Sequence, residues 1–311
     1  MIIQTTFSQM AFLFLLIAIG YILAKLNLVP DITEGVLSKL ENYVFIPALV
    51  MGTFMNNFTV DKIASAKDVL LGSIVIELAV IFLSMAVVRL CTKDKYIQKI
   101  YLYGLCFSNF GFMGNAIVGA LFPDIFMEYL LFTVVLWAGI YIWGAPVLLI
   151  GDDSGNKIFS VQRLKSFANP MFIGMIVGMV IGVSGVKVPA FADNLVTSLG
   201  NCMSPIAMLL SGMTVARRNI LDILKTKSVY VITAIRLVVY PLLFICIMHL
   251  IPMPKTVMIC GLCSIAMPLG LNTIVIPAAY GKDTSVAAGM ALVSHILSCI
   301  TIPLILMLAN F

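Results

Sequence analysis

Long stretches without a charged side chain are the feature that most constrains this chain. Eight of them contain no Lys, Arg, Asp or Glu: 1–24, 42–60, 100–123, 129–151, 166–186, 194–216, 256–281 and 284–311. Two more, 69–88 and 228–254, are each interrupted by a single charge, Glu77 and Arg236 respectively. A helix needs about 20 apolar residues to cross roughly 30 Å of hydrocarbon. The sequence therefore predicts an all-α polytopic membrane protein with ten transmembrane helices.

The composition excludes other classes of protein. Hydrophobic residues make up 61% of the chain and charged residues 11%, against about 45–50% and about 25% in soluble domains. These values rule out a soluble enzyme, a disordered tail and a disulfide-stapled secreted module. The sequence has no Walker loop, HExxH motif or dinucleotide fingerprint, so we expect no enzyme activity and no cofactor. The net charge of +5 forms no patch, which argues against a nucleic-acid partner.

Basic residues are distributed unequally between alternate loops. Fourteen of the 19 lie in the odd-numbered loops: Lys25, Lys39, Arg89, Lys93, Lys95, Lys99, Lys157, Arg163, Lys165, Arg217, Arg218, Lys225, Lys227 and Lys282. The opposite side has four, and Arg236 lies within a span. Because Lys and Arg favour the cytoplasmic side, we expect a multi-pass protein of the cell membrane with both termini outside the cytoplasm.

The two halves of the sequence match after a shift of 157 residues. Gly104-Leu105-Cys106 aligns with Gly261-Leu262-Cys263, and Asn115 aligns with Asn272 without a gap. Each half contains five predicted spans, an odd number, so the second half is expected to be inverted relative to the first. We therefore divide the chain into a first five-helix repeat (1–150), a cytoplasmic linker (151–165) and a second, inverted repeat (166–311).

Spans four and nine each carry helix-breaking residues just before an asparagine. Pro268 and Gly270 precede Asn272, and Gly114 precedes Asn115. Ordinary packing of small residues explains glycines in one span, but breaks at equivalent positions of two repeats favour a substrate site near the midplane. Free N–H groups at the start of a half-helix attract an anion. An asparagine side chain both donates and accepts hydrogen bonds.

Two charges are predicted to lie inside the membrane. Glu77 and Arg236 are near the middles of spans three and eight, where a charge costs roughly 2.5–3.5 kcal/mol on insertion scales. Three interpretations stay open. Glu77 carries a proton with Arg236 as its counter-ion, or Arg236 balances the carboxylate of the substrate, or the two form a static ion pair that joins two helices.

The most specific motifs are NFGFMGNAIVGALFP (109–123) and MPLGLNTIVIPAAYG (267–281). With the ten spans, they give the chain a resemblance to the auxin efflux carrier (AEC, or PIN-type) transporter family. That resemblance implies a fold like that of the bile-acid sodium symporters, in which broken helices four and nine cross. It further implies a dimerising scaffold of helices 1, 2, 6 and 7, and a mobile domain of helices 3–5 and 8–10. The sequence departs from the family at Gly111 and Gly114, where a proline is common.

The resemblance implies a secondary transporter that moves a small organic anion, such as auxin, malate or malonate, by an elevator-type motion. The expected substrate-binding residues are Asn115, Asn272, Gly114, Pro268, Gly270, Thr273, Ser108, Asn109, Pro47 and Ile46, with Glu77 and Arg236 as coupling charges. The coupling ion is H⁺ or Na⁺, or the protein is a uniporter, and no bound metal is expected. The expected partners are the substrate anion, the lipid bilayer and a second copy of the chain. The alternatives are a sodium-coupled symporter and a membrane sensor or scaffold that does not transport.

Overall fold

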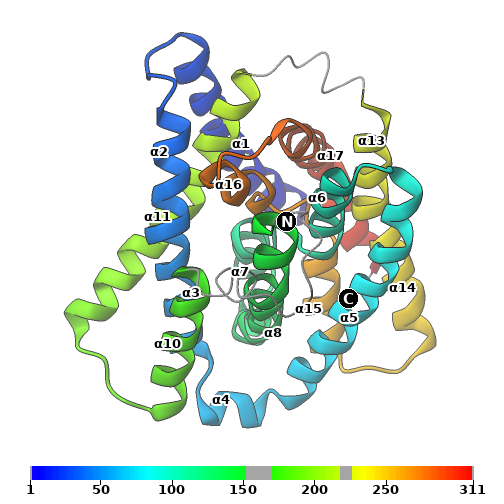
Figure 1. The fold of residues 1–311 in the computed structure, drawn as a ribbon. Coiled ribbons are helices and arrows are strands. Elements are labelled where there is room, and N and C mark those ends of the chain that lie inside the picture. Colours follow the sequence, from blue (N-terminus) through cyan, green and yellow to red (C-terminus); the bar gives the residue numbers. More distant parts are fainter. Residues whose placement is uncertain (1, 152–169, 218–225, 310–311) are drawn as a thin grey trace.

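The structure is a computed structural model that describes residues 2–151, 170–217 and 226–309 (Figure 1). The described residues are almost entirely helical and contain no strand beyond one isolated bridge. The first half comprises α1 (Ile2–Lys25), α2 (Thr33–Leu40), η1 (Glu41–Phe45), α3 (Ile46–Asn57), α4 (Val60–Ser65), α5 (Lys67–Cys91), α6 (Lys95–Cys106), η2 (Phe110–Gly114), α7 (Asn115–Leu121), η3 (Pro123–Ile125), α8 (Phe126–Gly139) and η4 (Ile140–Ile150). The predicted linker 151–165 lies outside the described residues except for Gly151.

The second half comprises α10 (Pro170–Ser184), α11 (Ala190–Ala216), α13 (Lys227–Ala234), η5 (Ile235–Val239), α14 (Tyr240–Leu250), α15 (Lys255–Ile265), α16 (Asn272–Ala279) and α17 (Ser285–Ala309). Segments η1, η2, η4 and η5 are π-helical. A π-helical turn inserts an extra residue into the helix and is frequent at functional sites.

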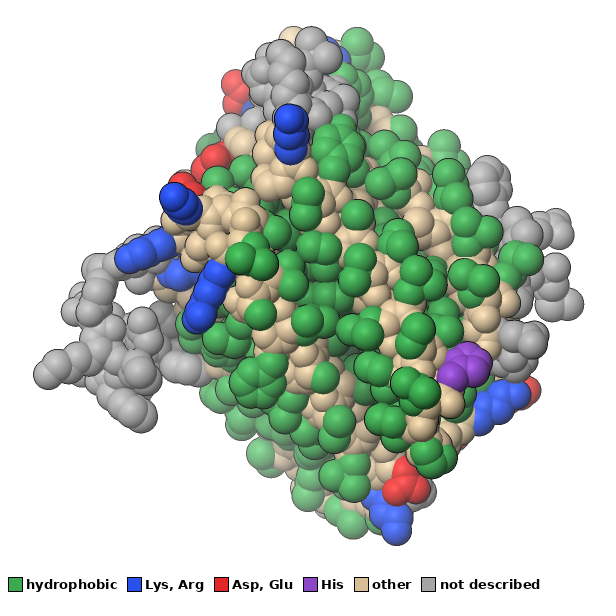
Figure 2. Space-filling view, turned by 90° about the vertical axis from the view of Figure 1, so that its right-hand side faces the viewer, with side chains coloured by type: hydrophobic (Ala, Val, Ile, Leu, Met, Phe, Trp, Pro, Cys, Tyr) green, Lys and Arg blue, Asp and Glu red, His purple; other side chains and the backbone are tan. Residues whose placement is uncertain are grey.

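Five helices of the described residues are long and apolar enough to cross a membrane. They are Lys67–Cys91, Pro123–Ile150, Ala190–Ala216, Lys227–Leu250 and Ser285–Ala309. The other apolar stretches form α1, shorter helices or helices with a break. Figure 2 shows that one whole face of the molecule is dominated by hydrophobic side chains, with charged side chains at its margins. The predicted all-α membrane fold is confirmed.

Glycines bring two pairs of helices into close contact. A Cβ added at Gly20 of α1 or at Gly212 of α11 would overlap a backbone carbonyl of the other helix. Helices α3 and α10 approach each other in the same way at Gly178. In Figure 1, α2, α3, α10 and α11 form one side of the molecule, α5, α13 and α14 form the other, and α6, α7, α15 and α16 lie between them. The broken helices are therefore held in the interior.

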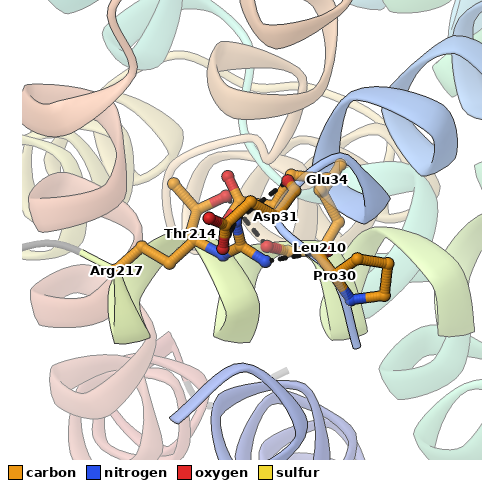
Figure 3. Close-up of polar contacts among 6 residues, drawn as sticks. All are labelled: Pro30, Asp31, Glu34, Leu210, Thr214 and Arg217. Atoms are coloured by element: carbon orange, nitrogen blue, oxygen red, sulfur yellow. Dashed lines mark hydrogen bonds and ion pairs between the residues drawn. The ribbon is translucent and has the colours of Figure 1, made fainter. Parts of the chain in front are cut away.

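A cluster around Arg217 fixes the chain between α1 and α2 against the end of α11 (Figure 3). The guanidinium pairs with Asp31 at 2.7 Å and with Glu34 at 2.9 Å. It also donates to the backbone carbonyl oxygens of Asp31 at 2.9 Å and Pro30 at 3.1 Å. The Asp31 side chain is almost fully exposed, so this cluster lies at a solvent-facing end of the helices, and it sets where α2 begins.

Candidate functional site

The two helices predicted to be broken meet at their breaks. The chain is unwound between α6 and η2, and again between α15 and α16. Across the meeting point, the backbone N–H of Asn109 donates to the Pro268 carbonyl oxygen at 2.8 Å. The backbone N–H of Gly270 donates to the Phe107 carbonyl oxygen at 3.3 Å. These bonds make a short antiparallel bridge that satisfies part of the backbone released by the two breaks. We call this junction the crossing.

Serine and threonine side chains bond to the backbone of the crossing. Ser108 Oγ donates to the Ser264 carbonyl at 2.7 Å, and Thr273 Oγ1 donates to the Gly270 carbonyl at 2.8 Å. Ser294 on α17 accepts from the Leu269 amide at 3.4 Å. Each of these hydroxyls substitutes for a helical hydrogen bond that the break removes, so they hold the unwound segments in one conformation.

A histidine holds Asn109 in place. Asn109 Nδ2 lies 3.0 Å from His295 Nε2, and His295 Nδ1 lies 2.8 Å from the Ala291 carbonyl oxygen. Because a carbonyl oxygen only accepts, Nδ1 carries the proton, and Nε2 accepts from the asparagine amide. His295 is thus a neutral, fully bonded group that orients Asn109 within the break.

Glycine is required at both breaks by close approach. A Cβ on Gly270 would lie 2.9 Å from the Phe107 carbonyl oxygen and 3.2 Å from that of Ser108. A Cβ on Gly114 would overlap the Tyr129 hydroxyl. The absence of a side chain at these two positions lets the two backbones and the α8 tyrosine pack this tightly.

Three asparagines at the crossing keep an unused acceptor. The buried Oδ1 atoms of Asn109, Asn115 and Asn272 have no hydrogen-bond partner. The other end of the Asn272 amide is fixed, because Nδ2 donates to the Tyr103 hydroxyl at 3.1 Å. An unsatisfied buried polar group costs about 1–3 kcal/mol. A buried acceptor of this kind marks a position where a ligand or water completes the hydrogen bonding.

Arg236, on the π-helical segment η5, is almost completely buried and bonds to the backbone of the crossing. Its Nη1 donates to the Leu105 carbonyl at 2.7 Å, its Nη2 to the Ser264 carbonyl at 3.1 Å and its Nε to the Met267 carbonyl at 3.3 Å. The guanidinium is therefore shared between both broken helices. Within the described residues it forms no ion pair with Glu77, so the static ion pair considered from the sequence is not what the structure shows.

Glu77 lies on α5 beside the first broken helix. Its Oε1 is 4.0 Å from the Cβ position of Gly139 and, although buried, has no hydrogen-bond partner. Tyr103 and Arg236 are both close enough to interact with its charge. Glu77 and Asn272 therefore both lie near Tyr103, and the Glu77 carboxyl is free to bind a proton or a further donor.

The predicted site residues fall into two groups in the structure. Eight are in or directly beside the breaks: Ser108, Asn109, Gly114, Asn115, Pro268, Gly270, Asn272 and Thr273. The other two lie on α3. Ile46 is fully buried, and the backbone of Pro47 packs against Gly174 of α10. Among the hydrogen bonds of the described residues, none joins Ile46 or Pro47 to the crossing.

Glu41 directly precedes the predicted span 42–60 and is absent from the predicted site residues. In the structure Glu41 is fully buried, and neither carboxylate oxygen has a hydrogen-bond partner. Ser38 and Asn42 are also fully buried, and Ser38 Oγ donates to the Val275 carbonyl of α16 at 2.6 Å. The spacing of these three residues, i, i+3 and i+4, puts them on one helix face. That spacing was the signal available in the sequence.

Cysteine and histidine side chains do not form a metal site in the described part of the chain. Cys246, His249, Cys260 and Cys263 imitate zinc-ligand spacing, but Cys260 and Cys263 are buried while Cys246 and His249 are exposed. No group of three potential ligands converges among the described residues.

The comparison with protein families agrees with this geometry. A family model described as "Membrane transport protein" matches residues 5–306, nearly the whole chain. No curated protein matches the chain. Since the family match covers both broken helices and the crossing between them, the chain belongs to the membrane transport protein family of auxin efflux carrier-type transporters and is a multi-pass membrane transporter, not an enzyme.

Proposed function

We propose that the protein is a secondary transporter of a small organic anion, a mono- or dicarboxylate, which it binds at the crossing. The observation that carries this proposal is the set of unpartnered amide oxygens on Asn109, Asn115 and Asn272. Asn109 directly precedes η2, Asn272 is the first residue of α16, and Asn115 follows the π-helical turn η2 as the first residue of α7. In transporters built from repeats, substrates bind where such discontinuous helices meet.

The chemistry of the crossing suits a carboxylic acid with a second polar group. The N-terminal ends of η2–α7 and of α16 carry the positive ends of helix dipoles, which favour a carboxylate. The Thr273 and Ile274 N–H groups of α16 are already bonded to the Gly270 and Leu271 carbonyl oxygens. The asparagine oxygens accept a hydrogen bond from a hydroxyl or from a protonated second carboxyl. Malate and malonate meet these requirements, as do larger acids with a polar N–H such as indole-3-acetate.

The proposed architecture is ten transmembrane helices in two inverted repeats. The protein lies in the cell membrane, with both termini outside the cytoplasm. The scaffold contains α1, α3, α10 and α11, whose glycine-mediated contacts support a single rigid unit. A homodimer forms through this scaffold. The mobile domain carries the crossing past the scaffold in an elevator-type motion, and this gives alternating access.

We further propose that Glu77 carries the coupling proton. Its buried Oε1 has no hydrogen-bond partner, and Arg236 is the basic group that interacts with its carboxyl. Arg236 itself is committed to three backbone carbonyls, which argues against its acting as the main partner of the substrate carboxylate.

The experiment is uptake of radiolabelled malonate, malate and indole-3-acetate into proteoliposomes, with charge movement recorded on the same preparation. Uptake detects electroneutral exchange that a current would miss. We expect saturable uptake that falls at least about tenfold in Asn115→Ala and Asn272→Ala. Asn56→Ala, at an exposed asparagine, is the matched control. Folded protein that binds an acid without moving it would instead establish a sensor.

A further inference from the structure

We propose that the Arg236 guanidinium is a fixed cation that fills the place of a bound metal cation at the crossing, so that this protein needs no sodium. For transport, this inference rests on the function proposed above. The cation site itself depends only on the contacts of Arg236, and it is tested without a substrate.

The three bonds of Arg236 are distributed over the crossing in a specific way. Leu105 is the penultimate residue of α6, and Ser264 is the penultimate residue of α15. Met267 lies in the unwound segment that follows α15. Three different nitrogens of one guanidinium therefore reach the C-terminal ends of both half-helices and the released backbone between them.

These carbonyl groups are what a cation site at a broken helix is made of. The last carbonyls of a helix have no intrahelical partner, and the helix dipole places partial negative charge there. In transporters with discontinuous helices, such C-terminal ends and unwound carbonyls coordinate Na⁺. Here the side chain supplies a delocalised positive charge with several donors in a fixed plane, and it stays protonated at any physiological pH.

Burial and backbone geometry hold the guanidinium in this position. Arg236 is only 1% exposed, so water does not replace its bonds. It belongs to the π-helical segment η5 between α13 and α14, and a π-helical turn is frequent where a helix serves a site. Glu77 is the acidic group that interacts with it.

The test measures the melting temperature of the purified full-length protein in choline chloride, sodium chloride, lithium chloride and guanidinium chloride at equal millimolar concentrations. We expect the wild type to melt at the same temperature in all four salts. Arg236→Ala should melt about 5 °C lower or more, and guanidinium should restore most of the loss, with sodium restoring less. Arg236→Lys should stay insensitive to the salts, as should Arg89→Ala, a control at an exposed arginine.

Two results would overturn the proposal. One is a saturable rise of the wild-type melting temperature with sodium, or direct binding of ²²Na⁺ to the wild type. This arm decides the question even if Arg236→Ala does not fold. The other is an Arg236→Ala protein that melts like the wild type and responds to no cation.

A transport arm separates this proposal from the proposed function. Uptake of labelled malonate by the wild type should be equal in choline and in sodium, and guanidinium should restore uptake in Arg236→Ala. If no acid in the panel is transported by the wild type, the proposed function fails, while the melting and ²²Na⁺ arms still decide the role of Arg236.

Discussion

The two kinds of helix end at the crossing are completed differently. The C-terminal ends of α6 and α15 are bonded to the guanidinium of Arg236. The beginnings of η2–α7 and α16 lie beside asparagine oxygens without partners. Both ends leave backbone groups unsatisfied by the same helix geometry. The protein therefore closes the end that attracts cations with its own guanidinium, and at the other end it leaves asparagine acceptors open to a hydrogen-bond donor.

The largest loss of stability is expected when the guanidinium that bonds the closed end is removed. Arg236→Met leaves three buried carbonyls without donors and Glu77 without its nearby cation. We expect the free energy of unfolding to fall by about 3–5 kcal/mol, because a buried charged network has lost one partner. Arg217→Met, at the partly exposed cluster of Figure 3, should cost about 0–1 kcal/mol. Denaturant unfolding in detergent compares the two, and equal losses would show that Arg236 is not special.

A second way to break the crossing is to force its backbones apart. Gly270→Ala places a methyl group 2.9 Å from the Phe107 carbonyl oxygen, and we expect a loss of about 1–3 kcal/mol from overpacking. Gly119→Ala on α7 is the matched control, because its nearest neighbour, the Phe126 ring, would be 3.5 Å away. Melting temperatures measured side by side test this. Equal melting temperatures of the two variants would contradict the close approach of Gly270 to the Phe107 carbonyl.

At the open end, we expect a substitution to affect uptake strongly and stability only slightly. Asn115→Ala removes an oxygen that has no partner, so stability should change by no more than about 0.5 kcal/mol. Uptake of the anion should nevertheless fall at least about tenfold. Melting and uptake measured on the same preparation separate the two effects. A large loss of stability together with unchanged uptake would make Asn115 a structural residue.

Coupling is tested with a variant of nearly the same size. Glu77→Gln keeps the shape of the side chain and removes the proton-binding carboxyl, so we expect uptake to persist while its dependence on a pH gradient disappears. Glu41→Gln, which makes the same change at a second buried carboxyl, is the control. An unchanged response of Glu77→Gln to the pH gradient would exclude Glu77 as the proton carrier.

The smallest combined effect on stability and uptake is expected when a single neutral hydrogen bond is removed. Thr273→Val removes the 2.8 Å hydrogen bond to the Gly270 carbonyl and keeps the volume of the side chain. We expect a loss of about 0.5–1.5 kcal/mol and nearly normal uptake. Unfolding and uptake assays check both parts. A loss as large as that of Arg236→Met would mean that the crossing lacks the separate ends described above.

The positions of the breaks were predictable from the sequence, whereas the partners of the buried charges were not. Pro268 and Gly270 interrupt a helix wherever they occur in it, so their place before Asn272 located the second break. The partner of Arg236 depends on which carbonyls the unwound segments release, and residue spacing does not contain that information. None of the three interpretations left open for Arg236 and Glu77 therefore included the three carbonyl acceptors of Arg236.

Glu41 was missed for a different reason. A count of charges along the chain treats a carboxylate at the edge of an apolar stretch as an interface residue. The structure buries it because α2 and η1 turn one polar face, with Ser38 and Asn42, inward. Helical periodicity within the span carries this signal, and a hydropathy average removes it.

Binding at the crossing is tested most directly by the protein's own fluorescence. The chain contains two tryptophans, and both contact phenylalanines at the first break. The ring centroids are 5.0 Å apart for Trp137 and Phe110, and 6.2 Å apart for Trp143 and Phe107. Titration of the purified protein with malonate and malate should give a saturable change in emission in the wild type and in Asn56→Ala, and none in Asn115→Ala or Asn272→Ala. A saturable change that survives in both of these asparagine variants, or no change in the wild type, would contradict binding of these acids at the crossing.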